Sequence, residues 1–151
     1  MATAHESMMG ILKLYELRSE ATMRKARDWF AGAFFPDTAQ DVVGVLASEH
    51  SAQFRMVVSY WDMAAGLVIF DAIQDEMFNS INTEHVAVYA KLQPFLEELR
   101  ATPGVSHYVW LKHLEPVVRR MPDVEARVAT MRRIIERRRA GAKRAQAEES
   151  R

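Results

Sequence analysis

Asp62 is the side chain whose position most clearly implies chemistry. It stands within the segment MVVSYWDMAAGLVIFDAI, in which Asp71 is the only other charged residue. A carboxylate among apolar residues must be paired, hydrogen-bonded or protonated. Two interpretations follow, a structural partner such as an Arg or Tyr from another helix, or a polar point in a ligand pocket between helices. In both cases we expect the carboxylate to bond a side chain from another helix.

Metal-binding and catalytic motifs are missing from the rest of the chain. There is no cysteine, and the sequence contains no Glu-x-x-His pair, which a helical di-iron site would require. No two of the five histidines are spaced three or four residues apart, so no two of them share one face of a helix as metal ligands. We expect these histidines to be exposed or to lie near helix ends. The six glycines form no phosphate-binding loop, and no G-x-S-x-G elbow is present. The sequence therefore predicts no metal, no cofactor and no catalytic residue, although a serine nucleophile assembled from distant positions stays open.

The C-terminal end of the chain is strongly basic. Residues 117–151 hold 11 Lys and Arg against 5 Asp and Glu, whereas residues 1–116 hold 9 against 15. The net charge of zero therefore conceals two segments of opposite net charge. Nucleic acid, an anionic membrane surface and an acidic protein patch would each fit such a segment, and a solvated helix and tail would also explain it. The candidate residues for binding an anionic partner are Arg132, Arg133, Arg137, Arg138 and Arg139.

The elements that must position these residues all have helical spacing. No segment alternates apolar and polar residues over the length of a strand, so we predict an all-α, single-domain bundle of five to seven helices. Its centre should be an apolar helix near 50–73. Because Ser59, Tyr60 and Asp62 interrupt this segment, we interpret it as a buried strut and not as a transmembrane helix.

Shorter helices should surround this strut. We expect a helix over 6–18 that presents Met8, Ile11, Leu12 and Tyr15 on one side. A short helix through about Leu46 should be capped by Thr38. A turn is expected around 79–82.

The second half of the chain should contain three more helical segments. A helix capped by Thr83 should be interrupted by Pro94, and a helix from Ser106 should be bent by Pro116. The last helix should begin at Pro122 and end its apolar stripe at Ile135. We accordingly divide the chain into a helical domain over 1–135 and a basic tail over 136–151 that frays, because that tail has no face to bury.

Three stretches together carry a family resemblance: ILKLYELRSEATMRKARDWF, HSAQFRMVVSYWDMAAGLVIFDAIQDEMF and YAKLQPFLEELR. They resemble a family of short, uncharacterised bacterial helical proteins that is classed as a domain of unknown function. The resemblance covers roughly residues 11–100 and leaves the basic tail outside. It implies an all-helical bacterial protein and brings no activity, cofactor or site residue with it.

Three functions are compatible with these observations. The leading one is a non-enzymatic protein-interaction or regulatory module, with a protein partner or self-association. The second is a nucleic-acid-associated protein that uses the Arg-rich end, and the third is a small-ligand pocket or enzyme around Asp62, which a deep cavity reaching Asp62 would favour. The lack of cysteine and of a signal peptide at the start of the sequence predicts a cytoplasmic protein.

Overall fold

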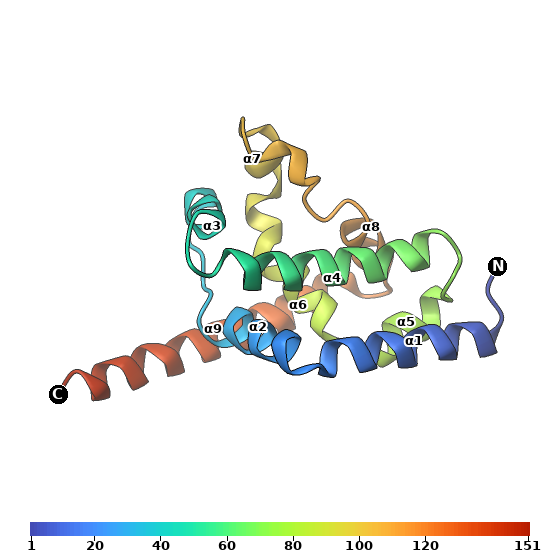
Figure 1. Cartoon of the computed structure of the whole chain (residues 1–151), viewed down its shortest axis with the longest axis horizontal. Coiled ribbons are helices and arrows are strands. Elements are labelled where there is room, and N and C mark those ends of the chain that lie inside the picture. Colours follow the sequence, from blue (N-terminus) through green and yellow to red (C-terminus); the bar gives the residue numbers. More distant parts are fainter.

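Nine α-helices and two short 3₁₀ helices, with no strand, make up the computed structural model of residues 1–151 (Figure 1). The helices are α1 (Ala4–Ser19), α2 (Ala21–Gly32), α3 (Ala39–Leu46), α4 (Ser51–Ile69), α5 (Asp75–Ile81), α6 (Glu84–Leu92), α7 (Leu96–Ala101), α8 (Leu114–Arg119) and α9 (Val124–Glu149). One continuous apolar core joins them. The all-α single-domain bundle is therefore confirmed, although it is divided into more and shorter helices than we expected.

The central apolar helix is α4, which packs against α2, α3, α6 and α8. Trp61, Ala64 and Ala65 are almost completely buried within it. It ends at Ile69, earlier than expected, because Asp71 adopts a left-handed conformation with φ 57° and the N–H groups of Ala72 and Ile73 both bond the carbonyl of Leu67.

Helix α1 faces the core with a stripe that shares only Ile11 with the one we predicted. Ser7, Ile11 and Leu14 point inward, whereas Met8, Leu12 and Tyr15 are exposed. Gly10 explains the rotation, because the side chain of Ile73 would lie only 3.1 Å from a Cβ atom at that position. The absence of a side chain at Gly10 thus allows α1 to pack closely against the chain that follows α4.

Local capping and prolines set several of the other boundaries. Thr38 caps α3 as predicted, since its hydroxyl accepts the Asp41 N–H while the Asp41 carboxylate accepts the Thr38 N–H. Pro94 also acts as predicted, because a 3₁₀ turn over Gln93–Phe95 separates α6 from α7. The turn expected around 79–82 is instead the end of α5, whose first turn holds Asp75 and Glu76 where acidic residues favour a helix.

The segment from Ser106 is not the bent helix that we predicted. A 3₁₀ helix over Ser106–Tyr108 is followed by an irregular turn, and α8 begins only at Leu114. Pro116 lies in the first turn of α8 and does not bend the helix, because the N–H groups of a first turn have no partner inside the helix.

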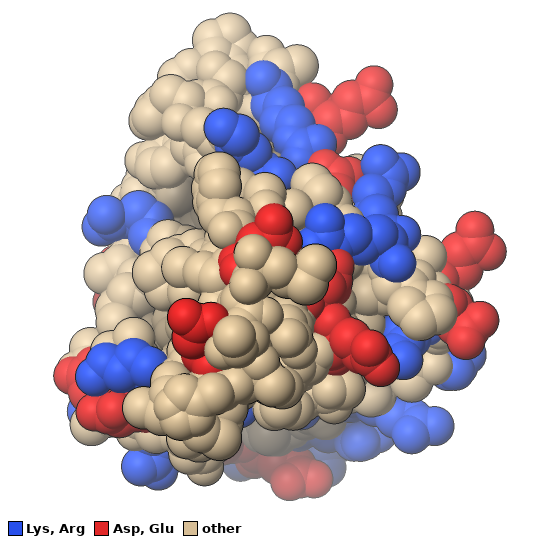
Figure 2. Space-filling model, turned by 90° about the vertical axis from the view of Figure 1, so that its right-hand side faces the viewer, with Lys and Arg blue, Asp and Glu red and all other residues tan.

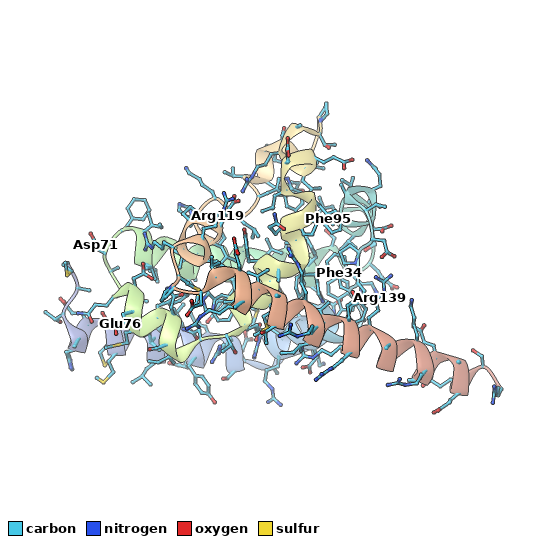
Figure 3. The ribbon with its side chains drawn as sticks, turned by 180° about the vertical axis from the view of Figure 1, so that it is seen from behind. Phe34, Asp71, Glu76, Phe95, Arg119 and Arg139 are labelled. Atoms are coloured by element: carbon cyan, nitrogen blue, oxygen red, sulfur yellow. The ribbon has the colours of Figure 1, made fainter.

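Helix α9 crosses the back of the bundle and contacts α6 and α2. Val128, Met131 and Ile135 pack against the core, as expected. Beyond Ile135, where we expected a frayed tail, the chain stays helical to Glu149 (Figure 3). Arg139 in this part of α9 pairs with Asp37. The remaining turns of α9 extend away from the body (Figure 1). None of the helices combines the length and apolar character needed to cross a bilayer.

Candidate functional site

The carboxylate of Asp62 is fully bonded by the segment that leads into α8. Its Oδ1 atom accepts the backbone N–H groups of His113 and Leu114, each at 2.9 Å, and its Oδ2 atom lies 3.0 Å from Nδ1 of His113. Asp62 therefore bonds a side chain from another part of the fold, as the sequence predicted, although the partner is a histidine and not an Arg or Tyr. The same carboxylate also caps the first turn of α8, which has no side-chain cap of its own.

Asp62 also lines the largest cavity of the molecule. An open groove of about 640 Å³ runs along the outer face of α4, between the end of α3 and the segment over 108–113. Apolar side chains form most of its surface, among them Val58, Leu67, Phe70 and Trp110. The polar and charged groups in its lining are Arg55, Ser59, Asp62, Tyr108 and His113. Asp62 therefore has structural partners and also lines a groove, so the two interpretations of this residue are compatible.

The far wall of the groove has an unusual backbone. Val109 and Leu111 both adopt left-handed conformations, with φ values of 53° and 52°. This region is unfavourable for side chains with a Cβ atom, and a β-branched valine is a clear outlier there. The two residues flank Trp110, which is buried against Phe54 in the floor. Strained backbone of this kind costs about 1–3 kcal/mol per residue and is concentrated at functional sites.

His113 is held in a single orientation at the edge of this groove. A carboxylate can only accept hydrogen bonds, so the imidazole donates its Nδ1–H to Asp62 and keeps Nε2 as its free nitrogen. The ring lies 3.6 Å from the position that a Cβ atom of Gly66 would occupy. Ser59, the hydroxyl of α4 that lines the groove, donates to the carbonyl of Arg55 at 2.5 Å. The arrangement can therefore bind and orient a ligand, but it does not join His113 to a nucleophile.

Three of the five arginines that we proposed for an anionic partner have partners within the chain. Arg139 forms a two-pronged ion pair with Asp37, Arg132 donates to Gln93 at 2.6 Å, and Arg133 donates to Thr130 at 3.0 Å. No hydrogen bond or ion pair engages the side chains of Arg137 and Arg138. The structure thus spreads the five residues around α9 and does not gather them into one site.

Charges of opposite sign are also mixed on the body of the molecule. On the face that includes the start of the chain, basic and acidic side chains are interspersed with uncharged surface (Figure 2). Arg120 pairs with Asp75, and Arg139 with Asp37, so some basic side chains of residues 117–151 form ion pairs with acidic side chains of residues 1–116.

Two further buried polar residues could not be predicted from the sequence. His85, which we expected to be exposed or near a helix end, is near the start of α6 but completely buried between Trp61 and Phe78. Burial lowers its pKa to about 4, and its Nδ1 atom has no hydrogen-bond partner. Lys91 is 8% exposed and donates from Nζ to the carbonyls of Phe30 and Phe34, while burial lowers its pKa to about 7. Both residues look ordinary in the sequence, because only the folded neighbours enclose them.

These features define an all-helical single-domain protein with one large apolar groove beside a fixed Asp–His pair. The chain belongs to the family described as a domain of unknown function, DUF4760, whose match covers residues 3–121. The match extends beyond the residues 11–100 on which we based the resemblance, and α9 lies outside it. Comparison with curated proteins and with solved structures gives no match.

Proposed function

We propose that this protein binds a small, mainly apolar molecule in the groove along α4. The observation that carries the proposal is the groove itself, which reaches Asp62. Its volume of about 640 Å³ falls within the range of roughly 300–1,000 Å³ for small-molecule sites. Such sites are typically apolar with a few polar groups that fix the orientation of the ligand, as Arg55, Asp62 and His113 would do here.

The strained wall of the groove supports the same proposal. The left-handed conformations at Val109 and Leu111 turn Trp110 and Leu111 toward α4, so that both line the groove. A fold under selection for stability alone would gain by replacing Val109 with glycine or asparagine. The exposure of Val109, at 52%, shows that packing does not require valine there.

Binding of the neutral dye Nile red, followed by its fluorescence, tests the proposal. The parent should bind one equivalent, and Ser59→Trp should abolish binding, because an exposed residue of the groove can be enlarged without disturbing the core. Leu67→Glu should weaken binding by placing a charge in the apolar lining. Leu12→Glu is the matched control, since Leu12 is exposed on α1 away from the groove. Equal dye binding by all four proteins would refute the proposal.

A protein-interaction module is the second candidate, and the exposed rim of the groove favours it. Phe70 is 76% exposed, and Met63 and Tyr108, which line the same groove, are about half exposed. Contiguous apolar surface of this kind is typical of interaction sites. Taking a second copy of the chain as the partner, Phe70→Asp should convert a dimer to a monomer in sedimentation velocity. A parent that is monomeric at every concentration would exclude self-association through this rim.

A further inference from the structure

The groove along α4 contains one charged side chain, that of Arg55, that has no ion-pair partner in the fold. Of its two fully charged residues, Asp62 accepts three hydrogen bonds from the segment that leads into α8. Arg55 makes only a long contact of 3.4 Å from Nε to the hydroxyl of Ser51, and it takes part in none of the ion pairs of the structure. The groove therefore presents a cation without a counter-ion.

Arg55 also lies toward one end of the groove. Lining residues continue along α4 from Arg55 to Leu67 and Phe70. With a rise of 1.5 Å per residue, Leu67 is about 18 Å and Phe70 about 22 Å from Arg55 along the helix. The charged end and the apolar far end are thus separated by a length that suits an elongated molecule. Asp62 lies two turns from Arg55, about 10 Å along the helix axis, and its carboxylate is held by donors of the segment that leads into α8, so it does not pair with Arg55.

We propose that the ligand is an anionic amphiphile with a single head group, which pairs with Arg55 while its apolar chain lies along α4 toward Phe70. This inference rests on the proposed function and specifies the class of ligand. A guanidinium group can form two parallel hydrogen bonds with a carboxylate or a phosphate, so both head groups share the required chemistry. The apolar chain would cover Val58, Met63 and Leu67, which water contacts in the free protein.

Calorimetric titration with four twelve-carbon compounds, each below its micelle concentration, tests the inference. Dodecanoate should bind about two- to fivefold more tightly than dodecanol, because its carboxylate can pair with the guanidinium of Arg55, an exposed ion pair that water partly screens. Dodecyltrimethylammonium should bind more weakly than dodecanol, because its charge has the same sign as Arg55. Dodecyl phosphate in the same titration distinguishes a phosphate from a carboxylate head group as the preferred anion.

Variants of Arg55 test whether its charge causes the preference for dodecanoate over dodecanol. Arg55→Gln should bring dodecanoate to the affinity of dodecanol, and Arg55→Lys should retain part of the preference. Arg24→Gln is the control, since Arg24 is an exposed arginine on α2 that forms no ion pair and does not line the groove. Melting curves of the variants should match that of the parent, because Arg55 is exposed.

The outcomes separate this inference from the proposed function. If dodecanol binds as tightly as dodecanoate and Ser59→Trp abolishes both, the groove binds apolar molecules but the anionic class is wrong. If a preference for dodecanoate survives in Arg55→Gln, the anion is held elsewhere and the inference is also wrong. If none of these compounds binds, both the inference and the proposed function fail.

Discussion

Replacing Asp62 tests the central contact between α4 and the segment that leads into α8. In Asp62→Ala, the N–H groups of His113 and Leu114 and the Nδ1–H of His113 lose the acceptor that now lies 2.9–3.0 Å from each of them. Loss of a capping side chain costs about 0.5–2 kcal/mol, and each hydrogen bond to a charged group contributes about 1.5–3 kcal/mol. Because the Asp62 side chain is 22% exposed, water replaces part of these bonds. We therefore expect a loss of about 2–3 kcal/mol in the free energy of unfolding.

Asp62→Asn should cost less, about 1 kcal/mol. The amide oxygen can still accept both backbone N–H groups, and the amide NH₂ can donate to Nδ1 of His113 once the imidazole moves its proton to Nε2. Ser59→Ala on the same face should change stability by less than about 0.5 kcal/mol and serves as the control.

Urea unfolding followed by tryptophan fluorescence and by circular dichroism measures these differences. Hydrogen exchange of the Leu114 amide gives an independent reading, because its protection should fall most in the alanine variant. If Asp62→Ala unfolds at the same urea concentration as Ser59→Ala, the carboxylate does not hold α8 and the reasoning is refuted.

The remaining predictions concern the core, a buried histidine and α9. Trp61→Ala should lower the free energy of unfolding by about 3–5 kcal/mol and Leu67→Ala by clearly less, because Leu67 lines an open groove; equal losses in calorimetry would contradict this placement. Stability should fall by up to about 3 kcal/mol as pH drops from 6.5 to 4, because only the unfolded chain then protonates His85, and urea midpoints of His85→Gln should depend less on pH. Any binding of duplex DNA should weaken with a salt slope of about −0.9 per neutralised phosphate, and alanine at all five proposed arginines should flatten it; no binding at low salt would exclude this function. The same five substitutions should lower the melting temperature, mainly through the lost pair of Arg139 with Asp37.

The sequence by itself determined the fold class and some of the local boundaries. The spacing of apolar residues, the capping pair Thr38 and Asp41, and the break at Pro94 each depend on contacts within a few residues, so they can be seen without a structure. The same holds for the requirement that Asp62 be bonded, because its apolar neighbours in the chain already imply it. The conformation of the 109–113 turn has no comparable signal, since neither Val109 nor Leu111 favours a left-handed backbone.

The tertiary structure alone decided which residues meet. His113 lies 51 positions from Asp62 along the chain, and nothing in its own neighbourhood marks it as the partner. The inward face of α1 depended on the approach of Ile73 to Gly10, and the burial of His85 depended on Trp61 and Phe78. The groove itself arises where α4 is left uncovered between α3 and the 108–113 segment, so its position could not be deduced from α4 alone. The spacing of apolar residues indicates that a helix has an apolar side. Which residues contact that side is determined by packing between segments that are distant in sequence.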